Sequence, residues 1–385
     1  DVDGSGETDP IGKIVTLEDT NHDGRFDKRT VYLDNLVIPR AVALVDDGVL
    51  VGEPPHLWFT RDTDGDGVCD EKTAIADDFG ARVGDIEHMA SAPTWMMDNW
   101  IYCSRHPVRY RYEGGGRFHS ERTTSRGEWG LSQDDAGRIF YNSNSDTLRA
   151  DFVPASYFLR NPHLALPAGL NVSVASPQLS VHPVRITPGI NRGYKLLGPD
   201  GKLRTVTASC APLIFRGTAL PDDFYGDAFI CEPAGNLVKR IALKPRGTAV
   251  VGENAYDGTE FLASTDERFR PVNLLTGPDG ALYLIDMYRG VLQHRMSVTT
   301  YLRRQIASRN LEEGRGLGRI YRISRTDAPP AEFSSGLDRA GTSDLVEQLE
   351  NRNGWVRDTA QRLLVERGDL AAVPFLRELA LSSDN

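Results

Sequence analysis

The stretch Asp279-Gly-Ala-Leu-Tyr-Leu-Ile285 is one of five copies of a sequence motif, in which a turn of Asp, Asn or Gly is followed by an alternating apolar strand. The other copies carry their aspartate at Asp47, Asp98, Asp135 and Asp227. The 92-residue interval before Asp227 fits two units or one unit with an insertion. Repetition at this period is typical of a β-propeller with four-stranded blades. We therefore predict an all-β fold, a six-bladed β-propeller. A two-sheet sandwich is the alternative, but it would not explain the periodic turn-strand motif.

The period of the apolar residues changes after Asp327-Ala-Pro-Pro330. Residues 343–349, 355–365 and 370–379 carry apolar side chains every three or four positions, which predicts three short helices. We expect the propeller with its calcium loops to span 1–328 and the start of HEAT-like helical repeats to span 340–385. One such repeat cannot bury its apolar face alone, so we expect that face to pack on something outside these residues. It includes Leu345, Leu349, Trp355, Leu363 and Leu376.

Two loops of matching sequence carry acidic residues at the same positions. Asp19-Thr-Asn-His-Asp-Gly-Arg-Phe-Asp27 and Asp62-Thr-Asp-Gly-Asp-Gly-Val-Cys-Asp70 have oxygen ligands at positions 1, 3, 5 and 9, a backbone carbonyl at 7, and glycine at 6. Position 12 is threonine, so they resemble dockerin and thrombospondin type 3 loops more than EF-hands. Ordinary Asp/Asn/Gly turns are the alternative. The predicted Ca²⁺ ligands are Asp19, Asn21, Asp23, Arg25, Asp27, Asp62, Asp64, Asp66, Val68 and Asp70.

Composition restricts the class of partner and the compartment. The net charge is −10 without a basic stripe, which argues against nucleic acid, and no apolar run is long enough to span a membrane. Calcium loops of this kind favour a periplasmic or extracellular location, and the start at Asp1 leads us to expect a product whose export signal was removed. The four cysteines lack C-x-x-C spacing, so bridges in any of three pairings or free buried thiols both remain open.

Several strings together resemble one known family over nearly the whole chain. They are Glu87-His88, Gly130-Leu-Ser-Gln-Asp-Asp135, Cys231-Glu-Pro233, Arg270-Pro-Val-Asn273, Asp286-Met-Tyr-Arg289 and Trp355-Val-Arg-Asp358. The chain resembles the membrane-bound-dehydrogenase-like proteins of planctomycetes. That resemblance implies a propeller, HEAT-like repeats and a cytochrome c domain. The haem c site belongs to that last domain, which this sequence lacks.

The propeller is similar, more weakly, to soluble quinoprotein glucose dehydrogenase and to aldose and L-sorbosone dehydrogenases. This similarity implies pyrroloquinoline quinone (PQQ) as cofactor and His88, ten residues before Asp98, as catalytic base. It also implies contacts to the quinone from Arg126, Arg268 and Arg270. The family string Arg-Asn-x-x-Gly-Leu has Gly127 in place of asparagine here, so one supporting contact is lost. Arginines suit the carboxylates of this cofactor, and Ca²⁺ would polarise its carbonyl.

The favoured function is therefore a PQQ-dependent sugar or alcohol dehydrogenase module that passes electrons to a cytochrome c. One alternative is a calcium-dependent lactonase-like hydrolase, with Glu53, Asn144, Asn273 and Asp286 as the ion ligands. Another is a non-catalytic, calcium-stabilised propeller and helical-repeat scaffold that binds carbohydrate or protein. The arginines favour the dehydrogenase, because a lactonase centre needs carboxylates and amides more than guanidinium groups. His88 and the arginines also have a structural interpretation, as hydrogen-bonded or ion-paired groups.

Overall fold

The computed structural model describes residues 4–21, 23–82, 84–161, 163–165, 168–327 and 336–383. Within them, five antiparallel sheets form the blades of a propeller. Blade 1 contains β3 (Ala41–Val45), β4 (Gly48–Glu53), β5 (His56–Arg61) and β6 (Glu71–Ala76). Blade 2 contains β7 (Ser91–Trp95), β8 (Ile101–Ser104), β9 (Val108–Tyr112) and β10 (Phe118–Arg122). Blade 3 contains β11 (Leu131–Gln133), β12 (Ile139–Ser143), β13 (Asp146–Asp151) and β14 (Val172–Ser173).

Blade 4 contains β15 (Cys210–Ile214), β16 (Ala228–Glu232), β17 (Leu237–Arg246), β18 (Ala249–Asn254) and β19 (Leu262–Ala263). Blade 5 contains β20 (Pro271–Thr276), β21 (Leu282–Asp286) and β22 (Arg319–Ile323). The first strands of the blades lie side by side in the order β3, β7, β11, β15 and β20. An apolar cluster fills the space between each consecutive pair of blades. The predicted propeller is thus present, and its core is a series of layers between the sheets.

The repeated motif matches the blades because the turn before each second strand needs a residue that tolerates a left-handed backbone. The turn before the second strand of each blade has φ of +50° to +84° at Asp46, Asn99, Gly137, Gly226 and Gly280. Glycine adopts this conformation freely, and Asn and Asp adopt it more readily than other residues. The apolar residues that follow are those buried between the blades.

The predicted count of six blades is not confirmed, because the described residues form five. The 92-residue interval holds one blade with an insertion: after β13 the chain forms mostly loops, with α1 (Ser156–Leu159), the two-residue β14 and η1 (Arg192–Tyr194). At the N-terminal end, β1 (Gly12–Glu18) and β2 (Lys28–Leu36) make only a two-stranded ribbon. It attaches near blade 1, where the Cys69 N–H donates to the Tyr32 carbonyl at 2.8 Å.

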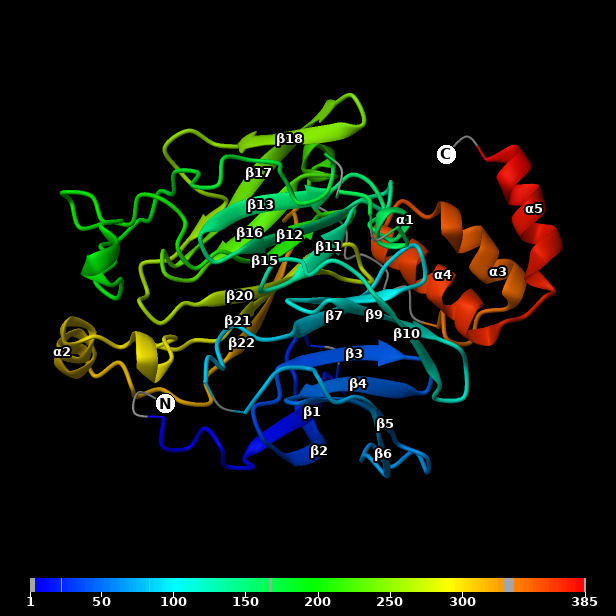
Figure 1. The fold of residues 1–385 in the computed structure, drawn as a ribbon, viewed down its shortest axis with the longest axis horizontal. Helices are drawn as coiled ribbons and strands as arrows, with labels where there is room; N and C mark the ends of the chain where they lie inside the picture. Colours follow the sequence, from blue (N-terminus) through cyan, green and yellow to red (C-terminus); the bar gives the residue numbers. More distant parts are fainter. Residues whose placement is uncertain are drawn as a thin grey trace.

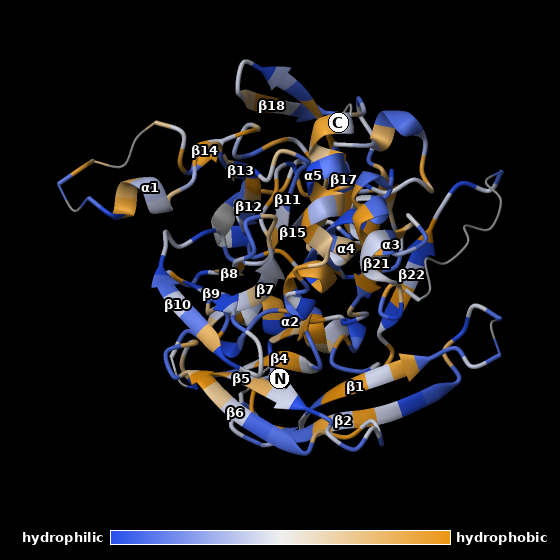
Figure 2. Cartoon of the chain, turned by 90° about the vertical axis from the view of Figure 1, so that its right-hand side faces the viewer, coloured by the Kyte–Doolittle hydropathy of each residue, from blue (hydrophilic) through white to orange (hydrophobic). Residues whose placement is uncertain are grey.

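Helices form where the sequence predicted them. They are α3 (Thr342–Glu347) with η4 (Gln348–Glu350), α4 (Gly354–Arg367) and α5 (Ala372–Ser382). Helix α4 lies over the centre of the ring of sheets (Figure 2). We expected the apolar face of this segment to pack outside these residues. Instead Leu345 is fully buried, whereas Leu376 of α5 remains 37% exposed.

Helix α4 bonds to the turn end of every blade. Its Asn353 cap donates to Gly277 O of blade 5 at 3.1 Å, and Glu366 at its other end accepts from Asp46 N of blade 1 at 2.8 Å. Between these ends, Asp358 pairs with Arg216 of blade 4 and Gln361 donates to Met97 O of blade 2 at 2.8 Å. The blade 3 contact is the ion pair of Arg357 with Asp135. The helix therefore links the first blade to the last.

The opposite end of the ring carries two insertions (Figure 1). One is the loop around η1, and the other holds η3 (Arg295–Ser297) and α2 (Thr300–Arg309). They bond to each other, since Gln293 Nε2 donates to Gly189 O at 3.1 Å and Tyr301 OH donates to Pro188 O at 3.0 Å. Among the described residues, none of the helices combines the length and apolarity that crossing a membrane would require. A short η2 (Asp222–Phe224) lies between β15 and β16.

Candidate functional site

A cavity of about 730 Å³ opens where the first strands of the blades begin, beneath the two insertions. Its wall is built from equivalent positions of the blades, the residues just before each first strand. Blade by blade these are Arg40, His88, Trp129, Ala208 and Arg270. The repeat therefore brings residues far apart in sequence to one place. Helix α4 lies at the other end of the channel, so it does not line this cavity.

His88 is a candidate base in this wall. Its ring lies 5.8 Å from the ring of Trp129, and its Nδ1 is buried without a hydrogen bond, 3.6 Å from Glu128 Oε1. Glu128 is held by Arg105 Nη1 at 2.7 Å and by the N–H of Asn144 at 3.2 Å. A carboxylate on the Nδ1 side favours the proton on that nitrogen, which leaves the lone pair on Nε2. The geometry thus supplies a cavity histidine with a carboxylate oxygen 3.6 Å from its Nδ1.

Arg40 holds the segment that carries His88. Its guanidinium donates to Ile86 O at 2.6 Å and to Glu87 O at 3.2 Å. Burial lowers the pKa of Arg40 to about 10. Within the described part of the chain, this guanidinium forms no ion pair with a carboxylate; it interacts with backbone carbonyls and with the Trp129 ring, whose centre lies 5.8 Å from the guanidinium carbon.

Arg270 has the same character on the facing blade. It is 6% exposed and donates to Pro233 O at 2.6 Å and to Gly290 O at 3.0 Å. Burial lowers its pKa to about 10. It too lacks an ion pair with any described carboxylate. Two desolvated guanidinium groups without carboxylate partners make the cavity attractive to an anion.

Acidic and amide groups complete the wall. Glu267 pairs with Arg185 at 3.4 Å through Oε2, while its Oε1 is buried without a partner in the described structure. A buried acceptor of this kind favours a ligand hydroxyl, because an unpaired buried oxygen is costly. The cavity can therefore bind a ligand with both anionic and hydroxyl groups.

Two predicted cofactor ligands lie elsewhere. Arg126 is buried between blades, where its Nε donates to Asp151 Oδ2 at 2.7 Å and its guanidinium carbon lies 4.9 Å from the centre of the Tyr102 ring. Arg268 donates to Asn310 O at 2.9 Å, at the end of α2. Neither lines the cavity. Of the four predicted catalytic and cofactor-binding residues, the structure brings together His88 and Arg270.

The lactonase-like ligand set is also divided. Asn144 and Asn273 line the cavity, but Glu53 and Asp286 do not. Glu53 accepts from Val37 N and from Trp58 Nε1, both at 2.9 Å. Asp286 Oδ1 accepts from the N–H groups of Arg270 at 2.7 Å and Tyr288 at 2.8 Å. Both carboxylates therefore accept hydrogen bonds from the protein itself and do not line the cavity.

The two acidic loops are hairpin turns outside the cavity, 19–27 between β1 and β2 and 62–70 between β5 and β6. Their internal hydrogen bonds match. Asp19 and Asp62 accept from the N–H groups of Gly24 and Gly67, each at 2.8 Å. Thr20 and Thr63 bond in the same way to the last aspartates, and these bonds lower the pKa of Asp27 and of Asp70.

In the second loop, one carboxylate oxygen each of Asp62, Asp64 and Asp70 lies within 4.8 Å of the others. Hard oxygen donors at this spacing suit a cation such as Ca²⁺. His22, inside the first loop, lies outside the described residues.

Sequence reasoning missed Arg40, Trp129, Glu128 and Glu267. The signal that could have found Arg40 and Trp129 is positional: both stand within three residues before a first strand, as His88 and Arg270 do. Glu128 could be found only from the path of the chain, because it lies 40 residues beyond His88.

Comparisons with known proteins give one family match. The model of the family described as "Domain of unknown function (DUF7133)" matches residues 2–327. No curated protein matches the chain significantly. A putative oxidoreductase (glucose dehydrogenase) of Thermus thermophilus is 14% identical, with a TM-score of 0.34, over 81% of this chain and 99% of that one.

A carbohydrate-active enzyme of family AA12 from Trichoderma reesei is 11% identical, with a TM-score of 0.40, over 72% of this chain and 90% of that one. A virginiamycin B lyase from Staphylococcus aureus is 12% identical, with a TM-score of 0.34, over 73% and 78%. Similarities at this level assign no activity to this chain.

Proposed function

We propose that this chain, which belongs to the DUF7133 family, is a dehydrogenase module. It would oxidise a sugar or alcohol with PQQ bound in the cavity at the start of the first strands. One observation carries the proposal. His88 and the buried Arg270, which forms no ion pair with a described carboxylate, line the same cavity of about 730 Å³. A base and a carboxylate-binding group are the two protein functions that this chemistry requires.

The donor set fits the cofactor. PQQ has three carboxylates. Arg40, Arg185 and Arg270 line the cavity, and of these Arg40 and Arg270 form no ion pair with a described carboxylate, whereas Arg185 pairs with Glu267. Arg270 uses one N–H of each nitrogen on backbone carbonyls, which leaves two of its five N–H groups for a ligand. We therefore assign the carboxylate contacts to Arg40 and Arg270, and no longer to Arg126 or Arg268.

The reaction removes a proton from the substrate hydroxyl and a hydride from the carbon that bears it. His88 takes the proton at Nε2, and Glu128 stabilises the imidazolium that results. The unpaired Glu267 Oε1 orients the substrate by accepting from another hydroxyl. PQQ supplies the two-electron acceptor when bound. The electrons would then pass to a cytochrome c.

The acidic loops have a separate, structural role in this proposal. Ca²⁺ bound at 62–70 and 19–27 would neutralise clustered carboxylates and fix the β1–β2 ribbon beside blade 1. These loops do not line the cavity, so this calcium would not polarise the quinone. Calcium loops also fit the proposed periplasmic or extracellular location.

The test is a titration with PQQ in buffer containing Ca²⁺, followed by the perturbation of the quinone absorbance. We expect saturation at one equivalent for the wild type and weaker binding for Arg40→Gln. Arg268→Gln is the matched control, because Arg268 lies outside the cavity. If the wild type leaves the absorbance unchanged at stoichiometric quinone, the non-catalytic scaffold becomes the better account.

A further inference from the structure

Two cysteines of blade 4 lie directly opposite each other. Cys210 begins β15 and Cys231 lies on the neighbouring antiparallel strand β16, and the two are partners in the register. Directly opposed residues of an antiparallel pair have Cα atoms about 4.5 to 5.5 Å apart. That separation lies within the range that a disulfide bridges. Both side chains also enter the apolar cluster between blades 4 and 5, so they lie on the same face of the sheet.

The two thiols differ in access. Cys210 lines the cavity, and its Sγ lies 3.8 Å from Val272 O on blade 5. Cys231 is completely buried. Burial, and then the adjacent Cys210, raise the pKa of Cys231 well above its ordinary value. A reagent in the cavity therefore meets Cys210 first, and Cys231 can react only with what Cys210 has become.

Cys69 and Cys103 provide no second pair of this kind. Cys69 lies in the loop 62–70, where its Sγ is 3.2 Å from Glu71 O. Cys103 is 2% exposed, within the cluster of blades 1 and 2. Among the described strand pairs, Cys210 and Cys231 are the two cysteines that face each other in register.

We infer that Cys210 and Cys231 form a redox-active thiol pair in the wall of the cavity, which small disulfides oxidise to a cross-strand disulfide. The Cys210 thiolate attacks one sulfur of the small disulfide, forms a mixed disulfide and releases one thiol. Cys231 then loses its proton, attacks Cys210 Sγ and displaces the second thiol. The products are one protein disulfide and two small thiols, so two electrons pass to the reagent. This inference does not depend on the proposed dehydrogenase function.

The experiment treats the native, full chain with bis(2-hydroxyethyl) disulfide. It then counts free thiols after unfolding and maps disulfide-linked peptides by mass spectrometry. The chain contains four cysteines, and we expect two free thiols to be lost as a link between Cys210 and Cys231, while the buried Cys103 stays free. Four remaining thiols, or a link between any other two cysteines, would overturn the inference.

Two variants separate the steps. Cys231→Ser should stop at the mixed disulfide, with one adduct mapped to Cys210. Cys210→Ser should leave Cys231 unmodified in the folded protein, because no reactive sulfur then faces the cavity. Equal modification of Cys231 in the wild type and in Cys210→Ser would contradict the order of attack. The wild-type peptide map decides the pairing even if a variant fails to fold.

Discussion

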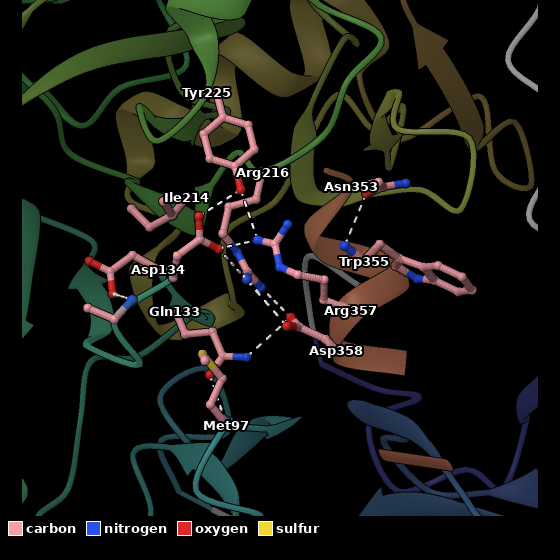
Figure 3. Close-up of polar contacts among 12 residues, drawn as sticks. Met97, Gln133, Asp134, Ile214, Arg216, Tyr225, Asn353, Trp355, Arg357 and Asp358 are labelled. Atoms are coloured by element: carbon pink, nitrogen blue, oxygen red, sulfur yellow. Dashed lines mark hydrogen bonds and ion pairs between the residues drawn. The ribbon is translucent and has the colours of Figure 1, made fainter. Parts of the chain in front are cut away.

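Arg216, which follows β15 in blade 4, forms an ion pair with Asp358 in the middle of α4 (Figure 3). The arginine is 7% exposed and also bonds to Asp135 Oδ1 at 3.0 Å, while Gln133 Nε2 donates to Asp358 at 3.2 Å. The network joins blades 3 and 4 to a helix more than 140 residues further along the chain. This network fixes helix α4 on the turn end of the propeller.

We predict that Asp358→Asn destabilises the protein by about 2 kcal/mol, because it removes one of the two carboxylates that pair with the largely desolvated Arg216 charge. Chemical denaturation monitored by tryptophan fluorescence measures the change. Asp338→Asn is the control, since its partner Arg339 is almost fully exposed, and it should change stability by less than about 0.5 kcal/mol. Equal effects of the two substitutions would mean that the helix contact contributes little.

The same network makes the stability sensitive to acid. Burial opposes ionisation of Asp135, but hydrogen bonds from Tyr225 and Arg216 and the charges of Arg216 and Arg357 outweigh it, and the pKa is lowered from 3.8. The unfolded chain therefore takes up this proton first as the pH falls. The contribution is fully present above about pH 4 and is lost as the pH falls through the folded pKa. In Asp135→Asn, we expect urea midpoints between pH 3 and pH 7 to vary less than in the wild type.

Glu232 should act in the opposite direction. Burial raises its pKa to about 7, although the N–H groups of Thr207 and Ala208 favour the ionised form. The folded state thus holds the proton more tightly than the unfolded state. Its contribution is present below the unfolded pKa of 4.5 and is lost as the pH rises through 7, on the order of 3 kcal/mol in total. In Glu232→Gln, stability should fall less between pH 5 and 8, while the exposed control Glu253→Gln should keep the wild-type profile.

Chelation of Ca²⁺ should lower the melting temperature, because the carboxylates of Asp62, Asp64 and Asp70 would repel one another once the ion is removed. Differential scanning calorimetry with and without excess chelator measures the change. Asp66→Ala should reproduce most of the loss that belongs to its own loop and leave the contribution of loop 19–27, whereas Asp257→Ala, at an exposed position, should keep the full dependence on Ca²⁺. A wild-type melting temperature that ignores the chelator would identify both loops as ordinary turns.

The strands were predictable because their signal is local. Each blade needs one residue with positive φ before its second strand, and Asp, Asn or Gly stands there every time. The number of blades was not predictable, because the described loop residues 181–206 are held by contacts distant in sequence, such as Pro188 with Tyr301 and Val206 with Leu237. No periodic pattern records contacts of that kind.

The site was predictable where position within the repeat decides it. His88 and Arg270 stand just before a first strand and reach the cavity. Arg126 matched a family string, yet the buried Asp151 of β13 holds its guanidinium between the blades. A one-dimensional pattern does not say which of two neighbouring spaces a side chain enters. The packing of α4 on five turns depends on side-chain contacts in the same way.

If the cavity holds PQQ beside a catalytic base, the reconstituted protein should reduce the quinone with excess sugar or alcohol, and the rate of that reduction is the most direct measurement. We predict that the wild type reduces bound quinone and that His88→Gln does so about 10² to 10⁴ times more slowly, with unchanged quinone affinity. A wild type that binds quinone but never reduces it with any aldose or alcohol, or a His88→Gln variant that reduces it at the wild-type rate, would contradict the account.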